Sequence, residues 1–176
     1  LPLIFINTFQ NTNITADFAL VQRIYNAPQS VVGSVATDFL KKKYLEGKLI
    51  GKRTMFVVTT LFINLLVFSS ILLIMIVASQ VIDNDRSDNL ITLSLVIIAP
   101  FVIKSVSSPL SAILILKDKF TKDMMFQLVL VTITVLAFAL VDTIEAYITV
   151  FSIVTSLFYL VYGFVSFYEM RVNKDD

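Results

Sequence analysis

Long runs of apolar residues alternate with short polar segments along most of this chain. The clearest run, residues 54–82, contains no charged side chain. About 20 apolar residues are enough for an α-helix to cross the hydrocarbon core of a bilayer. A helix also satisfies its backbone hydrogen bonds internally, as that environment requires. The pattern therefore predicts a transmembrane helix at this position.

The same pattern predicts an all-α polytopic membrane protein, a bundle of about six transmembrane helices of which the first is truncated. Segment 14–40 is the least apolar, because it contains Arg23, Asn26 and Pro28, and it would fall below a strict hydropathy threshold. The left end of the chain looks cut and the right end looks natural, so upstream residues are expected. The expected spans are residues 1–9 (partial), 14–40, 54–82, 90–116, 124–141 and 146–168.

Polar side chains in segment 14–40 recur on one face when the sequence is wound at about 100° per residue. A helix sorted in this way needs protein or water on one side, and lipid or a packed helix on the other. Pro28 removes a backbone donor, which predicts a kink. The polar face holds Arg23, Asn26, Ser30, Ser34 and Thr37, and the opposite face holds Val21, Ile24, Tyr25, Val32, Val35 and Phe39.

A second polar face surrounds Lys104, near the middle of segment 90–116. Lys104 lies roughly 18 Å from either end of that segment, beyond the reach of a lysine stem. A charged side chain at a helix centre costs at least about 2.5–3.5 kcal/mol, and such residues usually face a bundle interior or a water-filled cavity. Ser107, Ser108 and Ser111 share the face of Lys104.

Two cations among hydroxyls, with no carboxylate in the middle of the spans, favour an anionic ligand such as a diphosphate. Structural roles stay open for the same residues: Arg23 could snorkel or pair with a carboxylate, Lys104 could pair with an acid in an upstream part, and serines often pack helices together. The candidate binding residues are Arg23, Lys104, Asn26, Ser30 and Ser108.

Basic residues are distributed unevenly between the polar segments. Of the fourteen Lys and Arg, eleven lie in residues 41–53, in residues 117–123 and in the C-terminal tail, whereas the alternate loops hold only Arg86. Cytoplasmic loops of membrane proteins carry the excess of Lys and Arg. We therefore expect a multi-pass membrane protein with a cytoplasmic C-terminus.

Composition supports this class and argues against several others. The chain is 57% hydrophobic and 15% charged, against about 25% charged in soluble domains, and its mean hydropathy is +0.85. It contains neither His nor Cys, so common zinc ligands and thiol or imidazole catalysts are missing. Net charge is only +1. We expect no enzyme activity, catalytic residue, metal site, cofactor or nucleic-acid partner.

Two segments resemble bacterial polysaccharide flippases, in the second half of that family's sequence. Residues 18–34 read FALVQRIYNAPQSVVGS and match a helix with Ala-x-x-x-Arg-Ile/Leu, then Pro, then a Gly-Ser pair. Residues 98–111 read IAPFVIKSVSSPLS and resemble a later helix with Ala-Pro and Ser-Pro-Leu-Ser. The resemblance covers nearly the whole chain, in the expected order and spacing.

The resemblance implies one lobe of a V-shaped transporter of the bacterial inner membrane, made of two helix bundles, with the N-terminal bundle missing here. The implied substrate is an undecaprenyl-diphosphate-linked oligosaccharide for O-antigen, capsule or exopolysaccharide synthesis, moved by alternating access. Arg23 and Lys104 would attract the diphosphate. Expected partners are this lipid-linked oligosaccharide, membrane lipid, the N-terminal bundle and a polysaccharide polymerase. Alternatives are a multidrug exporter of the same superfamily, a membrane enzyme of polysaccharide assembly, and a non-transporting scaffold.

Overall fold

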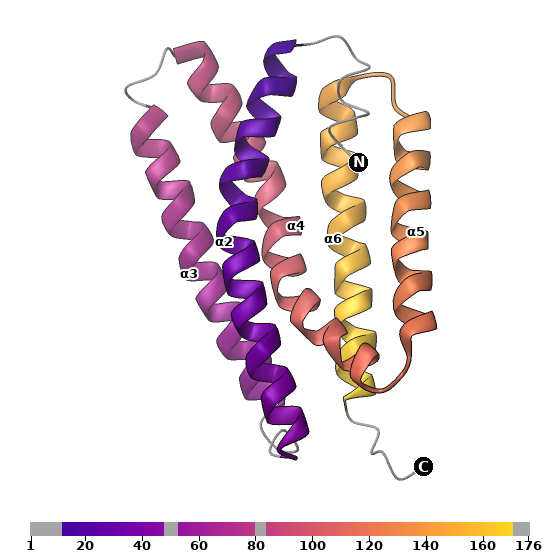
Figure 1. Cartoon of the computed structure of the whole chain (residues 1–176). Coiled ribbons are helices and arrows are strands. Elements are labelled where there is room, and N and C mark those ends of the chain that lie inside the picture. The colour runs from indigo at the N-terminus through magenta and orange to yellow at the C-terminus, as the bar shows by residue number, and fades with distance from the viewer. Residues whose placement is uncertain (1–11, 48–52, 80–83, 171–176) are drawn as a thin grey trace.

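The computed structural model describes residues 12–47, 53–79 and 84–170, which form a bundle of α-helices. Successive helices run in opposite directions, as Figure 1 shows. The truncated helix expected at residues 1–9 lies outside the described residues. The helices are α2 (Thr12–Leu45), α3 (Arg53–Ser79), α4 (Asn84–Leu116), α5 (Phe120–Ala139) and α6 (Ile144–Glu169).

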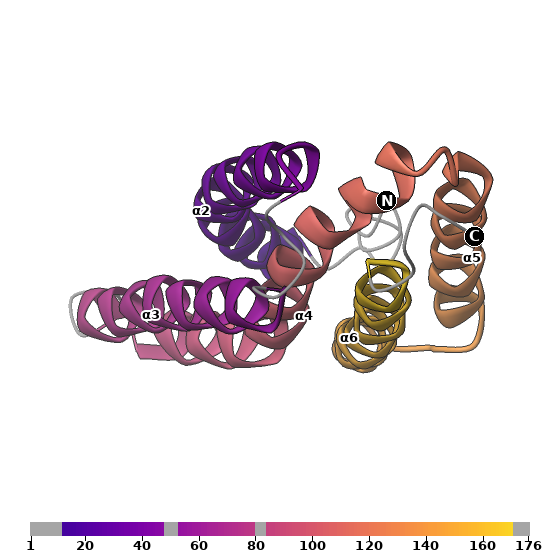
Figure 2. The same cartoon turned by 90° about the horizontal axis from the view of Figure 1, so that it is seen from below.

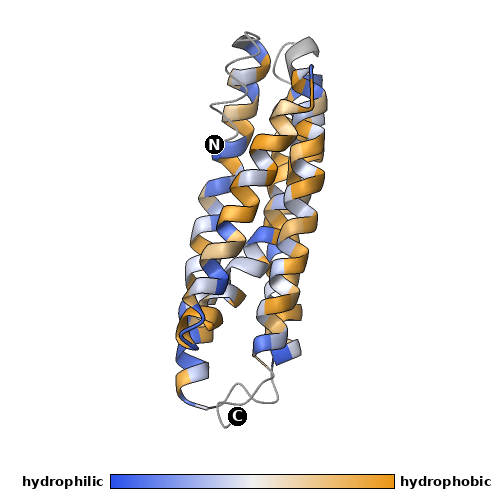
Figure 3. Cartoon of the chain, turned by 90° about the vertical axis from the view of Figure 1, so that its right-hand side faces the viewer, coloured by the Kyte–Doolittle hydropathy of each residue, from blue (hydrophilic) through white to orange (hydrophobic). Residues whose placement is uncertain are grey.

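Four of these helices are long and apolar enough to cross a membrane: α3, residues 88–116 of α4, α5 and α6. The expectation of a multi-pass, all-helical membrane protein is therefore confirmed. Helix α2 is continuous across the expected mixed-polarity segment, but it is not among the four. In Figure 3 hydrophobic colour covers most of the helical length, and much of the strongest hydrophilic colour lies toward the two ends.

The helices extend beyond several of the apolar segments that predicted them. Helix α2 continues to Leu45, into the basic segment 41–53 that was expected to be a loop. Helix α4 begins at Asn84, between the expected spans 54–82 and 90–116. Helix α5 likewise begins at Phe120 rather than at residue 124. Hydropathy marks where lipid begins, whereas a helix can continue into water with its backbone bonds intact.

Helix α4 is the central element of the bundle and contacts each of the other four described helices. Its most extensive interfaces are with α6 and α2. Viewed from the end, α4 lies between two pairs of helices (Figure 2). Helices α2 and α3 are on one side of it, and helices α5 and α6 are on the other. Pro100 and Pro109 lie inside α4, and prolines of this kind bend helices because they remove backbone donors.

The largest buried cluster joins α2, α3, α4 and α6. Tyr25 of α2 is fully buried at its centre. The ring centroid of Tyr25 lies 5.6 Å from that of Phe68 and 5.7 Å from that of Phe101. A second cluster packs Leu40 against Leu110 and other residues at the opposite end of α2. Helix α2 is therefore anchored near both ends.

Most basic residues of the described ranges lie at one end of the bundle. The alternating helix directions bring the C-terminal ends of α2, α4 and α6 together with the first turns of α3 and α5 (Figure 1). The short α4–α5 connection and the start of α5 carry Lys117, Lys119 and Lys122, and the last turn of α2 carries Lys42 and Lys43. We call this end, which carries more basic than acidic side chains, the cationic end. Among the described residues, its acidic side chains are Glu46, Asp118, Asp123 and Glu169.

Candidate functional site

A cavity of about 280 Å³ lies where α2, α4, α5 and α6 meet. Each of these helices contributes side chains four residues apart in sequence, a spacing that places them on one helix face. The cavity combines polar side chains with an aromatic and aliphatic wall. Its lining residues are Gln22 and Asn26 of α2, Pro100, Phe101 and Lys104 of α4, Gln127, Leu130, Val131 and Thr134 of α5, and Phe151, Thr155 and Tyr159 of α6.

Lys104 supplies the only charge among the residues that line this cavity. Its ammonium nitrogen lies 5.9 Å from the centroid of the Tyr159 ring, within the range of a cation–π interaction. Within the described ranges, Lys104 takes part in no ion pair. The ring offsets part of the cost of a cation in the middle of a membrane helix, and it leaves the ammonium protons available to a ligand.

The uncharged polar groups of the cavity offer further hydrogen bonds. Among the described residues, the buried Thr155 hydroxyl oxygen has no hydrogen-bond partner. The Thr134 hydroxyl, by contrast, donates to the Leu130 carbonyl at 2.8 Å. Gln22 and Gln127 add amide groups from α2 and α5. A buried hydroxyl without a partner is unfavourable, so a polar group placed in the cavity would gain a hydrogen bond from Thr155.

The structure brings together only some of the predicted site residues. Asn26 and Lys104 line the same cavity. Ser30 and Ser108 instead line a separate groove of about 320 Å³ between α2 and α4. The carboxyl group of Asp38 also borders that groove, which makes it less suitable for an anion. Arg23 is exposed and lines neither space.

Several hydroxyls of the predicted polar faces bond to their own helices. Ser30 donates to the Ala27 carbonyl at 2.8 Å and Ser34 to the Val31 carbonyl at 2.9 Å. In α4, Ser111 donates to the Ser108 carbonyl at 2.7 Å. Such bonds let a hydroxyl sit in an apolar environment without a second partner. These serines therefore need no ligand to satisfy them.

Ser107 belongs to the predicted polar face of Lys104, but it joins two helices. It is buried, and its hydroxyl donates to the Tyr159 carbonyl of α6 at 2.8 Å. A Cβ atom built on Gly163 would lie 2.5 Å from this hydroxyl oxygen. Glycine at that position is what allows α4 and α6 to approach so closely, as small residues do in membrane bundles.

Sequence reasoning missed the contribution of α5 and α6 to the cavity. Gln127 is the only amide side chain of α5, and a lone amide in an apolar helix is a usable signal. Phe151, Thr155 and Tyr159 follow one another at four-residue spacing in α6. Aromatic and threonine residues at that spacing are common in packed helices, so only the tertiary structure singles them out.

Comparison with protein-family models, with curated proteins and with solved structures finds no match for this chain. Among the described residues, no group of three or more acidic side chains is placed to hold a metal ion.

Proposed function

We propose that this chain is one helical bundle of a membrane transporter that flips undecaprenyl-diphosphate-linked oligosaccharides for surface polysaccharide synthesis. The observation that carries the proposal is Lys104, which lies without an ion-pair partner among the described residues, in a polar cavity between four helices. An ionisable residue inside a membrane bundle is by default a candidate functional residue.

The charge of the cavity selects the class of ligand. A lysine ammonium is a compact point charge that binds phosphate well. The neighbouring amides and the Thr155 hydroxyl can donate to phosphate oxygens. A cavity of about 280 Å³ suits a diphosphate group rather than a whole oligosaccharide. The sugar and the polyprenyl chain would extend beyond it.

The proposed topology follows from the cationic end of the bundle. Cytoplasmic segments carry the excess of Lys and Arg, so we place this end and the C-terminus in the cytoplasm of a bacterial cell. In this proposal the described helices belong to one lobe, and a second bundle faces it to form a V. A polysaccharide polymerase would then receive the flipped substrate.

A second candidate is a cation-coupled multidrug exporter, and one observation favours it. Asp17 of α2 is only 3% exposed, so the bundle contains a buried carboxylate. Exporters of this kind often use a buried carboxylate for proton or sodium coupling. Lys104 favours the flippase, because a cation in the cavity repels the cationic compounds that many exporters carry.

Complementation with the gene that encodes this chain tests the proposal. The host lacks its own flippase but contains the matching glycosyltransferases, and the readouts are surface polysaccharide and the pool of lipid-linked repeat units. We expect restored polysaccharide and a drained pool. An undrained pool, with the protein present in the membrane and the correct sugar supplied, would contradict the flippase and favour the exporter.

Variants at the two candidate cations sharpen this experiment. Lys104→Ala should reduce flipping at least about tenfold, since one charge-assisted hydrogen bond contributes about 1.5–3 kcal/mol. Lys104→Arg should retain much of it. Arg23→Ala should have a smaller effect, because Arg23 does not line the cavity. Unimpaired flipping by Lys104→Ala, at equal protein level, would remove the cavity from the mechanism.

A further inference from the structure

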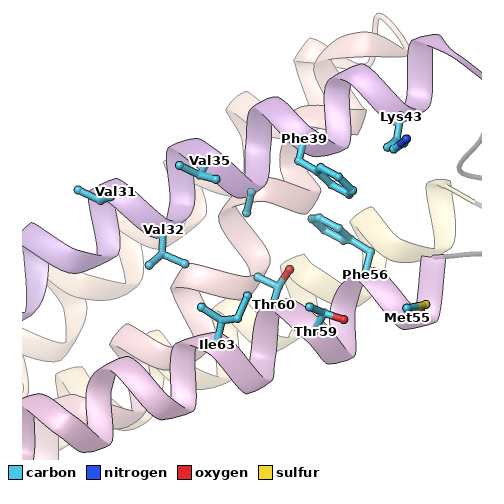
Figure 4. A pocket seen from close by; sticks show the side chains of 11 residues that line it. Val31, Val32, Val35, Phe39, Lys43, Met55, Phe56, Thr59, Thr60 and Ile63 are labelled. Atoms are coloured by element: carbon cyan, nitrogen blue, oxygen red, sulfur yellow. The ribbon is translucent and has the colours of Figure 1, made fainter.

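An apolar groove of about 600 Å³ runs between α2 and α3, apart from the cavity around Lys104. Figure 4 shows Val32 of α2 directed toward Ile63 and Thr60 of α3 across it. Val35 and Ile63 are 65% and 44% exposed. No residue lines both this groove and the cavity, so a molecule in one need not enter the other.

The groove ends in an aromatic pair beside a cation. The rings of Phe39 and Phe56 stack at 6.0 Å with an interplanar angle of 4°. Lys43 follows one turn later, with its ammonium 5.7 Å from the Phe39 ring centroid. Lys43 also pairs with Glu46 at 3.6 Å, but this pair is partly exposed and therefore weak. An anion at the groove mouth can compete for Lys43.

The dimensions of the groove correspond to one leaflet of a bilayer. From Val31 to Lys43 the lining of α2 extends over thirteen residues, whose twelve steps of about 1.5 Å span about 18 Å of helix. Half of the hydrocarbon core is about 15 Å thick. A transmembrane helix would need a groove about twice as long, whereas one acyl chain of a lipid in this leaflet fits along it.

The charge around the groove mouth indicates which lipid headgroup belongs there. Lys43 lies at the cationic end of the bundle, and Lys41 and Lys42 precede it on the exposed surface of α2. Basic side chains near a membrane surface attract anionic lipids. We propose that this groove binds an acyl chain of an anionic phospholipid, with the phosphate at Lys43. The proposal depends on membrane insertion and not on the transported substrate.

The chain contains no Trp, so a single introduced Trp can report on the lipid in the groove. Val35→Trp places the reporter in the groove. Leu160→Trp is the matched control, because Leu160 is 53% exposed on α6, at a similar distance from the cationic end. The chain is reconstituted in phosphatidylcholine vesicles with a minor share of acyl-brominated phosphatidylglycerol, or the same share of brominated phosphatidylcholine.

We expect brominated phosphatidylglycerol to quench Val35→Trp more strongly, through a local enrichment of roughly fivefold over phosphatidylcholine. The Leu160→Trp control should show little preference between the two lipids. Equal quenching of Val35→Trp by both lipids would overturn the proposal. Quenching of Val35→Trp by either lipid far below that of the control would also overturn it, because protein would then occupy the groove.

The role of Lys43 is tested in the Val35→Trp background. Lys43→Gln should abolish most of the preference for phosphatidylglycerol while quenching by phosphatidylcholine stays unchanged. Lys42→Gln is the matched control, since Lys42 is an exposed neighbour that does not line the groove. Equal losses in the two variants would indicate diffuse attraction to the cationic end and would overturn the assignment of the phosphate to Lys43.

Discussion

The interface between α4 and α6 and the interface between α2 and α3 represent two ways of placing helices side by side in a membrane. Helices α4 and α6 share the most extensive contact in the bundle, whereas α2 and α3 share one of the slightest. The first is built on small and hydroxylated residues around Gly163 and Ser107. The second is open and apolar along its groove.

The difference shows that apolar character and burial need not go together in a membrane bundle. Helix α3 is the most apolar of the spans, yet only 11% of the residues in its most apolar 18-residue stretch are buried. The corresponding share for α4 is 44%. Lipid is as apolar as leucine, so it does not drive α3 inward. Helices α4 and α6 associate because small residues permit close contact and polar groups find partners there.

The largest expected effect concerns the close approach of α4 and α6. Gly163→Ala should lower the free energy of unfolding by about 2 kcal/mol, roughly thirtyfold in the equilibrium constant, because its methyl group collides with the Ser107 hydroxyl. Thermal unfolding in detergent measures this. Adding Ser107→Ala should restore part of the loss, since it removes the atom 2.5 Å away.

Gly33→Ala is the matched control on the looser side of the bundle. A Cβ atom there would meet nothing within 4 Å, so the variant should gain about 0.5–1 kcal/mol from the higher helix propensity of alanine. Comparable losses in the Gly163 and Gly33 variants would contradict the specific role of Gly163 in the close approach of α4 and α6.

The second prediction compares two faces of α2 by single cysteines, which the chain permits because it has none. Asn26 and Val35 are both exposed, nine residues apart and therefore on opposite faces. A water-soluble maleimide should label Asn26→Cys in the cavity on the order of tenfold faster than Val35→Cys in the groove. Lipid in the groove keeps the water-soluble reagent away from the thiol.

Both cysteine variants are measured in lipid vesicles and again in denaturant, where their rates should become equal. Equal rates in vesicles would mean either that water fills the apolar groove or that it does not reach the cavity. Either result would remove the distinction between the two spaces.

The smallest effect concerns ion pairs at the cationic end. Glu169 is 6% exposed, and its carboxylate accepts from Lys119 at 2.5 Å and from Lys122 at 2.6 Å. It joins the start of α5 to the end of α6. Glu169→Gln should lower the free energy of unfolding by about 1 kcal/mol, because the lysines are partly exposed and their bonds are screened.

Glu46→Gln removes the exposed pair with Lys43 at 3.6 Å and should cost less than about 0.5 kcal/mol. Thermal unfolding at low and high salt measures both variants. A larger loss from Glu46→Gln than from Glu169→Gln would show that the α2 end, rather than the α5–α6 end, is held together by charge.

The arrangement of the cationic end was predictable in part. The clustering of lysines in alternate loops already indicated that these segments share one side of the membrane. The partners of these lysines on α6 were not predictable. One example is the Lys117 ammonium, which donates to the Glu169 carbonyl at 2.5 Å. Desolvation, together with the charge of Lys119, lowers the pKa of Lys117. These contacts depend on how α5 and α6 turn about their axes, which hydropathy does not report.

The candidate site was predictable only for residues whose cost in lipid is high. A lysine or an asparagine is costly to place in an apolar segment, which makes Lys104 and Asn26 recognisable from the sequence. Both line the cavity. Thr155 and Tyr159 do not, because a threonine or tyrosine in a span is common and inexpensive. Helix periodicity grouped Ser30 with Asn26 on α2 and Ser108 with Lys104 on α4. A period identifies the face of a helix, but not the helix that packs opposite that face.

The sequence by itself determined that this protein is helical, that it crosses a membrane several times, and which ends of its helices are basic. These properties follow from the transfer of each segment between water and lipid, which depends on local composition alone. Only the tertiary structure decided that α4 lies at the centre, that Lys104 meets α5 and α6, and that α2 and α3 leave a groove. Those outcomes depend on close packing between helices, which rests on single residues such as Gly163 and on the rotation of each helix about its axis.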